Sequence, residues 1–249
     1  MTEKIFLITG GTSGIGLATA QKILQKDLGR VVLIGRDSER GDRALNYLHD
    51  SRSFFVQSDV KNSSNCDKIF RDVIEKFGRI DCLINSAGIY HEGEIQSVDE
   101  GIFDDVFDTN VKGTFFMCRA VVDELRRTRG NIVNISSDAG VRGNYFCSLY
   151  SASKGAVVAF TRSLALELAR DGVRVNCVCP GDVDTPMTEK QFLRSGMQRQ
   201  IFYDELASVY PLKRIATADE VANTIVFLAS DEASFITGSI LAVDGGLTA

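Results

Sequence analysis

The sequence lacks several features that mark particular classes of protein. It has no excess of basic residues: the net charge is −5 and the isoelectric point is near 5.2, so the chain does not offer the basic face that nucleic-acid phosphates require. No apolar run approaches the roughly 20 residues that span a bilayer, and the N-terminus has no signal-peptide pattern. We therefore expect a cytoplasmic protein with no nucleic-acid partner and no membrane partner.

Cysteine and histidine lack the spacing of metal sites or disulfide frameworks. The six cysteines are scattered without a Cys-x-x-Cys pair, and the two histidines, His49 and His91, have no partner at ligand spacing. Cys177 and Cys179 alternate as in a strand, so their thiols should face one side of a sheet as small core residues. We predict neither a metal site nor disulfide bonds.

The composition that remains fits a single globular domain. The chain has 249 residues, of which 44% are hydrophobic and 24% charged, which is enough for a substantial core with an ordinary polar surface. No internal repeat, linker or low-complexity segment divides it. We predict one catalytic domain over residues 1–249.

A strand–turn–helix–strand unit opens the chain. Residues 5–9 form a short apolar run typical of a buried parallel strand, residues 17–26 are amphipathic, and residues 30–34 are apolar again. The turn between the first two carries Gly10, Gly14 and Gly16. Glycines let backbone approach a pyrophosphate closely, and the following helix N-terminus offers free N–H groups. This unit predicts a nucleotide-binding site.

The alternation of strands and helices continues to the end of the chain. Strands are expected at residues 54–57, 80–84, 130–137, 173–181 and 236–246, and helices at residues 38–49, 63–77, 99–127, after residue 149 and at 217–229. Such alternation predicts an α/β fold, a doubly wound parallel sheet with helices on both faces. Ligands of such sheets lie at the carboxyl ends of the strands.

Residues 99–127 combine an apolar face with one polar interruption. Phe103, Val106, Phe107, Phe115 and Phe116 are candidates for inward positions. Asn110 interrupts this face, and an asparagine within a helix is unfavourable unless its amide finds partners. It is either a satisfied core amide or a residue with a polar role.

Tyr150 and Lys154 lie four residues apart, so on a helix they share one face. A nearby positive charge favours phenolate, which would lower the pKa of Tyr150 and suit it to proton transfer near neutral pH. Many solvated helices carry such a pair by chance. Ser137, at the end of a predicted strand, is either a turn former or a hydrogen-bond donor to a ligand.

Five segments together resemble the motifs of the short-chain dehydrogenase/reductase family, in its single-domain branch of about this length. They are Thr9-Gly-Gly-Thr-Ser-Gly-Ile-Gly16, Asn85-Ser-Ala-Gly88, Asn110-Val-Lys-Gly113, Ser137 with Tyr150-Ser-Ala-Ser-Lys154 thirteen residues later, and Pro180-Gly-Asp-Val-Asp-Thr185. The resemblance covers essentially the whole chain and is weakest across residues 186–214. It implies a seven-stranded Rossmann-type sheet.

The resemblance also implies a reaction, hydride transfer between NADP(H) or NAD(H) and a carbonyl or secondary alcohol. Tyr150 would be the general acid/base, Lys154 would lower the pKa of Tyr150 and bind the nicotinamide ribose, and Ser137 would polarise the substrate oxygen. Asn110 would kink its helix and hold a water for proton relay. Two alternatives are a non-catalytic nucleotide-binding sensor and a lyase or epimerase on the same fold.

The cofactor contacts implied by the family are spread over the chain. They are Gly10, Thr12, Ser13, Gly14, Ile15, Gly16, Arg36, Asp59, Val60, Asn85, Tyr150, Lys154, Pro180, Gly181, Val183 and Thr185. Gly35 stands where an NAD-selecting aspartate is usual, and Arg36 could accommodate a 2′-phosphate, so NADP(H) is favoured. Ser13 occupies the family's other position that is basic in NADP(H)-binding members, so that second basic residue is absent. Asp37 could also reach the adenosine ribose, and NAD(H) therefore stays an alternative.

The substrate is less well defined. Tyr90, the loop at 141–149 and a substrate-covering segment at 186–214 should shape the pocket, with Tyr145, Phe146, Met187 and Phe192 as apolar groups. Polyols, acyl-thioester ketones and steroid-like alcohols all fit this mixture. The family implies a homo-oligomer, a dimer or a homotetramer, that pairs the long helices carrying Asn110 and Tyr150.

Overall fold

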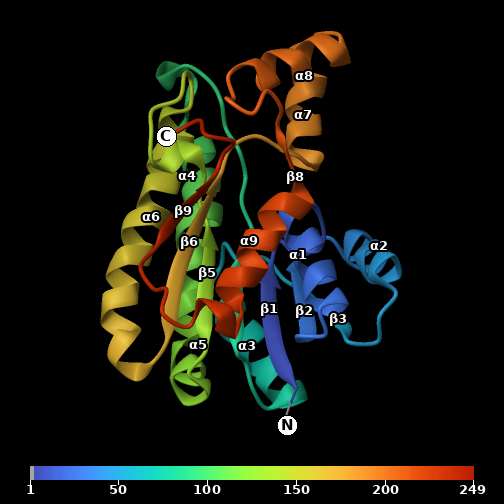
Figure 1. The fold of residues 1–249 in the computed structure, drawn as a ribbon, viewed down its shortest axis with the longest axis vertical. Coiled ribbons are helices and arrows are strands. Elements are labelled where there is room, and N and C mark those ends of the chain that lie inside the picture. Colours follow the sequence, from blue (N-terminus) through green and yellow to red (C-terminus); the bar gives the residue numbers. More distant parts are fainter. Residues whose placement is uncertain (1–2) are drawn as a thin grey trace.

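A seven-stranded parallel sheet forms the centre of the protein in the computed structural model, which describes residues 3–249. The strand order is β3-β2-β1-β4-β5-β6-β9 and every neighbouring pair is parallel (Figure 1). The strands are β1 Lys4–Thr9, β2 Gly29–Gly35, β3 Ser53–Gln57, β4 Cys82–Asn85, β5 Asn131–Ile135, β6 Arg174–Pro180 and β9 Ile240–Val243. The predicted doubly wound, seven-stranded Rossmann-type sheet is confirmed.

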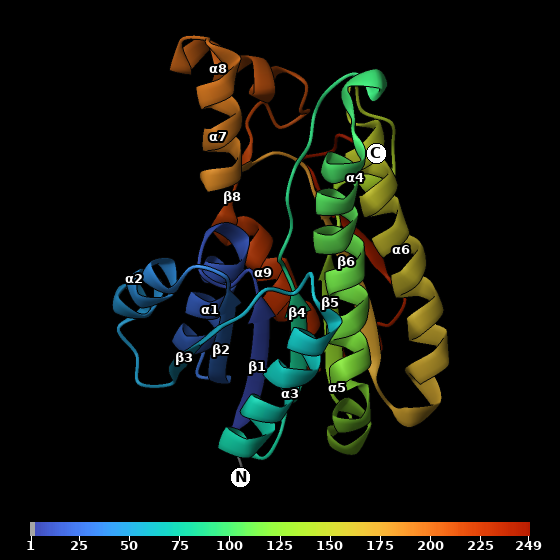
Figure 2. The same cartoon turned by 180° about the vertical axis from the view of Figure 1, so that it is seen from behind.

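Helices cover both faces of this sheet (Figures 1 and 2). On one face lie α1 Gly14–Gln25, α2 Ser38–Leu48 and α9 Ala218–Ala229; on the other lie α3 Ser63–Phe77, α4 Glu100–Phe107, α5 Thr114–Thr128 and α6 Ser148–Leu168. Short 3₁₀ turns occur at Ile95–Ser97, Asp138–Gly140, Ala169–Asp171 and Asp231–Ala233. None of the helices within residues 3–249 is both long enough and apolar enough to cross a membrane.

The two faces have separate apolar cores because successive side chains of a strand point in opposite directions. In β1, Leu7 joins the core under α3 and α5, whereas Phe6 and Ile8 join the core under α1 and α9. Cys177 and Cys179 pack together against α6, as the alternation in β6 predicted. All six cysteines are buried and free.

The helix between residues 99 and 127 is interrupted rather than simply amphipathic. A π-helical segment, Asp108–Gly113, joins α4 to α5 and contains Asn110. Val106 is buried as expected, but Phe103 and Phe115 are 45% and 47% exposed, so their inward assignment was wrong. The π segment adds residues to one turn and rotates the register of the two helices, and Phe103 stacks on Phe107 on the outer surface.

Residues 186–214 form two helices, α7 Pro186–Ser195 and α8 Arg199–Ser208, beyond the carboxyl ends of the strands (Figures 1 and 2). The two helices contact one another through the rings of Phe192, Phe202 and Tyr203. A small parallel pair, β7 Val183–Asp184 with β8 Ala216–Thr217, brings the two ends of this segment together. We call residues 186–214 the substrate cover.

Helix α9 begins with the capping box that its sequence suggests. The Thr217 hydroxyl accepts from the Glu220 backbone N–H at 3.3 Å, and the Glu220 carboxylate accepts from the Thr217 N–H at 2.9 Å. The box satisfies two N–H groups that would otherwise have no partner at the helix start. It fixes α9 directly after β8, where the cover ends.

Candidate active site

The sequence-predicted residues converge at the carboxyl edge of the sheet. Gly10 follows β1, Arg36 follows β2, Asp59 follows β3 and Ser137 follows β5. The register places Thr9 of β1 beside both Ile34 of β2 and Asn85 of β4. Because all these strands are parallel, residues far apart in the sequence end at one edge, which is where ligands lie in open α/β sheets.

The glycine loop depends on two close backbone approaches. A Cβ at Gly10 would lie 2.8 Å from the Ala87 backbone, and Gly10 has a φ of +64°. A Cβ at Gly16 would lie 2.5 Å from the Gly10 carbonyl oxygen. Only glycine satisfies these positions without moving backbone, so the tight turn from β1 into α1 rests on residue type here.

The N-terminus of α1 is open to an anion. Ser13 precedes the helix in an extended conformation without a side-chain cap, and the first turn has no acidic residue. Its N–H groups and helix dipole therefore favour a phosphate. Gly14 leaves space that Thr185 borders, since a Cβ there would lie 3.4 Å from the Thr185 side chain. These features fit the pyrophosphate of a dinucleotide between Thr185 and α1.

At the end of β2, a side chain at residue 35 would require the Thr12 side chain to move. A Cβ at Gly35 would lie 2.9 Å from Thr12 Cγ2. Arg36 is paired only distantly, with its Nη1 at 3.7 Å from Asp59 Oδ2. Asp37 caps α2, because its Oδ1 accepts from the Arg40 N–H at 3.0 Å. The end of β2 therefore presents a guanidinium, with Asp37 engaged elsewhere.

Val60 and Asn85 act inside the protein rather than at its surface. Val60 is buried, and its side chain would lie 2.8 Å from a Cβ at Gly113. The Asn85 Nδ2 donates to Asn134 Oδ1 at 2.9 Å, and Asn134 donates to Thr161 of α6. The Asn85 side chain thus ties β4 to β5 and α6, and any direct contact of Val60 or Asn85 with cofactor stays a prediction.

Helix α6 brings Tyr150 and Lys154 into the same buried region. Tyr150 is 8% exposed and Lys154 is 5% exposed. The Lys154 Nζ donates to the Ile135 carbonyl at 2.9 Å and lies 5.8 Å from the centroid of the Tyr150 ring. Burial lowers the pKa of Lys154 to about 8, because an ammonium loses hydration there.

The pKa of Tyr150 differs from the expectation. Burial raises it above its ordinary value, and the principal opposing influence is the neighbouring Ser137 hydroxyl rather than the charge of Lys154. The phenol is enclosed: the Tyr90 ring packs edge-on against it with centroids 4.9 Å apart, and Cys147 belongs to the same cluster. The predicted lowering by Lys154 is not met in this geometry, and Tyr150 is protonated at neutral pH.

Ser137 is held by an acidic neighbour that the sequence reasoning missed. The Ser137 Oγ donates to Asp138 Oδ1 at 2.8 Å and accepts from the Ala139 N–H at 3.2 Å. Asp138 Oδ2 accepts from Asn144 Nδ2 at 3.0 Å and Arg142 Nε at 3.3 Å. Adjacency to Ser137 was the only signal in the sequence, and it said nothing about the direction of the carboxylate.

Asn110 joins the loop after β4 to helix α6 through its amide. Its Oδ1 accepts from the Ile89 N–H at 2.9 Å, and its Nδ2 donates to the Ile89 carbonyl and to Ser153 Oγ, each at 3.0 Å. Ser153, which sequence reasoning also missed, donates to the Tyr150 carbonyl at 2.7 Å. Asn110 therefore supports the helix that carries Tyr150, and its predicted water-holding role stays a prediction.

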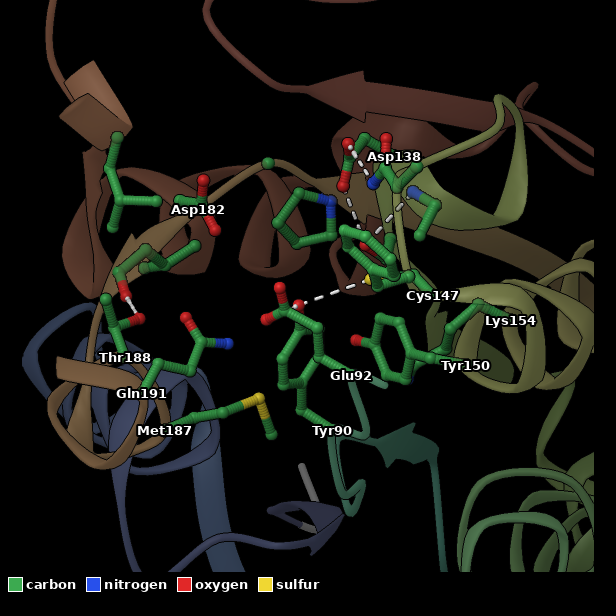
Figure 3. A pocket seen from close by; sticks show the side chains of 18 of the residues that line it. Tyr90, Glu92, Asp138, Cys147, Tyr150, Lys154, Asp182, Met187, Thr188 and Gln191 are labelled. Carbon is green, nitrogen blue, oxygen red and sulfur yellow. Dashed lines mark hydrogen bonds between the residues drawn. The ribbon is translucent and has the colours of Figure 1, made fainter. Parts of the chain in front are cut away.

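A cavity of about 980 Å³ lies between these residues and the substrate cover. Among the predicted residues, its lining contains Ile15, Ser137, Tyr150, Lys154, Pro180, Gly181, Val183 and Thr185. Figure 3 shows Tyr90 and Glu92 on one side of the Tyr150 hydroxyl, with Met187 and Gln191 of the cover across the open space. Tyr145 and Phe146, predicted as apolar walls, line the cavity but are 93% and 57% exposed.

Asp182 is a second carboxylate of this cavity that sequence reasoning missed. Its Oδ2 accepts from the Tyr210 hydroxyl at 2.8 Å, and burial raises its pKa. The same Tyr210 oxygen accepts from the Asp182 N–H at 2.6 Å. Its place just after Pro180-Gly181 was a usable signal, because that motif already pointed to the cofactor.

Comparison with known protein families agrees with this geometry. The family model described as Enoyl-(Acyl carrier protein) reductase matches residues 10–248. A 3beta-hydroxysteroid dehydrogenase of Mediterraneibacter gnavus is 38% identical over 269 aligned positions, covering 99% of this chain and 95% of the relative. A meso-2,3-butanediol dehydrogenase of Serratia marcescens is 37% identical, covering 99% and 95%.

Solved structures match over nearly the whole chain. ElxO with NADP bound superposes with a TM-score of 0.90 at 33% identity, covering 98% of each chain. A 3-ketoacyl-(acyl-carrier-protein) reductase from Brucella melitensis complexed with NADH gives a TM-score of 0.89 at 29% identity, covering 99% of this chain and 98% of the other. The matched proteins thus hold either form of nicotinamide dinucleotide.

Proposed function

The chain belongs to the short-chain dehydrogenase/reductase family, and we propose that it transfers a hydride between NADP(H) and a carbonyl or secondary alcohol carbon. The observation that carries the proposal is one cavity that contains Tyr150, Lys154 and Ser137 and that Thr185 connects to the uncapped start of α1. A proton donor, a cation and a hydroxyl thus meet beside a phosphate-compatible helix end.

Each residue has a distinct part in the reaction. A bound nicotinamide supplies or accepts the hydride. Tyr150, protonated because burial raises its pKa, gives its proton to the carbonyl oxygen in reduction and removes it, as phenolate, in oxidation. Ser137 orients the substrate oxygen by hydrogen bonding. Lys154 would bind the nicotinamide ribose, and Asn110 supports the Tyr150 helix through Ser153.

NADP(H) is the preferred cofactor in this proposal. A side chain at Gly35 would have to displace that of Thr12, and the ion pair of Arg36 with Asp59 is long, at 3.7 Å. A guanidinium without a close carboxylate can form paired hydrogen bonds with a 2′-phosphate. Asp37 is occupied as the α2 cap, which weakens the case for NAD(H).

The alternatives are separable from hydride transfer. A non-catalytic sensor would have no need for Ser137, Tyr150 and Lys154 together in one cavity. A lyase or epimerase would use bound nucleotide without net change. The protein can be incubated with NADPH and a panel of ketones while the NADPH absorbance is followed. Hydride transfer predicts net oxidation of NADPH, whereas a sensor and a lyase or epimerase both predict none.

The decisive variant is Tyr150→Phe. We expect a loss of turnover of at least about 1000-fold, of the order that general acid catalysis supplies, with NADPH affinity changed less than about threefold. Steady-state kinetics and fluorescence titration of NADPH measure the two quantities. Tyr203→Phe, in the substrate cover, is the matched control and should retain turnover. Turnover of Tyr150→Phe near that of the unmodified protein would disprove the assignment.

We also propose that the protein assembles through the surface of α4, α5 and α6. Phe103 and Phe115 are exposed there, and Phe115 lies 5.3 Å, between ring centroids, from Phe160 of α6. Exposed aromatic groups that gather on one face favour association with a second copy. Sedimentation equilibrium should give a dimer or tetramer, and Phe115→Glu should yield smaller species; a monomeric unmodified protein would contradict the proposal.

A further inference from the structure

The Ser137 hydroxyl has one proton, and in this structure that proton points to Asp138. A serine hydroxyl donates once and accepts through its lone pairs. Ser137 Oγ donates to Asp138 Oδ1 at 2.8 Å, while the carboxylate is itself held through Oδ2 by Asn144 and Arg142. Asp138 is 7% exposed, so its charge lies inside the site and is only partly screened by water.

The surroundings of Tyr150 make that charge important. The charged or titratable groups around the phenol come from five parts of the fold: Lys154 of α6, Asp138 after β5, Cys147 before α6, Tyr90 after β4 and Asp182 after β6. Lys154 is the only cation of this set, and its Nζ donates to Ile135 rather than to the phenol. Among the carboxylates, only Asp138 is bonded to Ser137.

We propose that Asp138 is a positioning residue of the reaction: it orients the Ser137 hydroxyl and uses its negative charge to keep Tyr150 protonated. The inference rests on the proposed hydride-transfer function. Orientation comes from the hydrogen bond between the Ser137 hydroxyl and the carboxylate. Substrate must then compete with the carboxylate for the Ser137 proton, and a carboxylate is a stronger acceptor than a carbonyl oxygen.

The charge also disfavours the phenolate of Tyr150, which adds to the effect of burial on its pKa. Oxidation of an alcohol requires phenolate and reduction requires phenol. The overall equilibrium between reactants does not depend on the enzyme, so at one pH a substitution must change kcat/KM in both directions by the same factor. Removal of the charge should therefore move the acid limb of oxidation and the alkaline limb of reduction together to lower pH.

Two substitutions separate the two roles. Asp138→Asn keeps an acceptor oxygen for Ser137 and removes the charge, whereas Asp138→Ala removes both. We expect both limbs to move down by about one pH unit in each variant, the order of shift that a nearby charge produces. Below pH 8, kcat/KM of Asp138→Asn should rise about threefold in each direction, because the proton is only partly transferred in the transition state. Asp138→Ala leaves the Ser137 proton free for substrate, so its substrate KM should be about tenfold below that of Asp138→Asn.

The control is Glu92→Gln, which removes an exposed carboxylate from the rim of the same cavity, where Tyr90 donates to it at 2.9 Å. It should leave both limbs in place. The proposal is wrong if Asp138→Asn leaves the limbs unmoved, if Glu92→Gln moves them equally, or if Asp138→Ala and Asp138→Asn have the same substrate KM.

A second measurement does not require turnover. Carbon-13 labelling of tyrosine Cζ lets NMR follow the titration of Tyr150 in the complex with NADP⁺, with Tyr150→Phe identifying its resonance. Asp138→Asn should begin to titrate at lower pH than the unmodified protein. An unchanged titration overturns the role of Asp138 whether or not any substrate is converted, whereas a shifted titration without turnover would contradict only the proposed function.

Discussion

The glycine loop at residues 10–16 and the substrate cover at 186–214 meet across one cavity, yet they are built differently. In the loop, conformation depends on backbone spacing: Gly16 has no space for a Cβ beside the Gly10 carbonyl. In the cover, conformation depends on side chains, since Phe192 and Phe202 hold α7 on α8. The loop therefore tolerates one residue type at its closest points, while the cover can change sequence and keep its shape.

This difference suits the roles proposed for the two regions. Pyrophosphate is common to all nicotinamide dinucleotides, so a loop that binds it has no reason to vary. A cover built from side-chain contacts can be altered to admit another substrate. The comparison predicts that equal substitutions have unequal effects in the two regions.

The largest effect should come from Gly16→Ala. The added methyl would lie 2.5 Å from the Gly10 carbonyl oxygen, so the turn must open and the start of α1 must move. We expect at least a 100-fold loss of NADPH affinity and a loss of roughly 3 kcal/mol or more in the free energy of unfolding. Gly143→Ala is the matched control, because nothing lies within 4 Å of its Cβ position. Isothermal titration measures the NADPH affinity and urea unfolding measures the free energy of unfolding. Equal losses in Gly16→Ala and Gly143→Ala would contradict the special role of the close approach at Gly16.

Lys154 lies between the two regions, and Lys154→Met should separate function from stability. Burial lowers its pKa from 10.5 to about 8, so the folded protein binds the proton less tightly than the unfolded chain. This destabilises the fold fully below pH 8, and the destabilisation disappears as pH rises through 10.5. Lys154→Met should therefore raise the free energy of unfolding by about 1–3 kcal/mol at pH 7, while turnover is lost.

The increase in the free energy of unfolding of Lys154→Met should be smaller at pH 10 than at pH 7, which urea unfolding at the two pH values can test. Lys112→Met provides the control, since the Lys112 side chain is 45% exposed and should give no gain. A destabilised Lys154→Met at pH 7 would mean that the lost hydrogen bond to the Ile135 carbonyl outweighs the relief of burying a charge.

A smaller effect is expected at the adenosine end of the loop region. Arg36→Ala should raise the KM for NADPH about tenfold, because a charge-assisted contact with the 2′-phosphate is lost, and should leave the KM for NADH within about twofold. Arg40→Ala, on the exposed side of α2, should change neither. Equal effects of Arg36→Ala on the two nucleotides would show that Arg36 does not select NADP(H).

The smallest effect on the whole molecule should come from the cover. Phe202→Ala removes a buried ring from the contact between α7 and α8, so the substrate KM should rise about threefold and proteolysis within 186–214 should quicken. Because Phe202 belongs to neither main core, the melting temperature should fall by less than about 2 °C. Leu193→Ala, at a 70% exposed position, is the control. A cooperative loss of global stability would show that the cover is part of the main fold.

The sequence predicted the sheet well because each strand is a short buried run and each helix has a periodic face. It also placed the reactive residues in one region, since parallel strands end at one edge. The interruption at Asp108–Gly113 was anticipated only as a kink at Asn110, and it misled the assignment of Phe103 and Phe115. Periodicity assumes one helical register, and a π segment changes that register partway.

By itself, the sequence determined the order of the motifs along the chain, the glycine loop and the Tyr150–Lys154 pair, because local spacing and residue type are enough for these. Only the tertiary structure decided the direction of the Ser137 proton, the raised pKa of Tyr150 and the position of Asp182 in the cavity. These depend on burial and on the relative placement of side chains from different strands. The sequence shows that these side chains are present, but their electrostatic environment exists only after the sheet has brought them together.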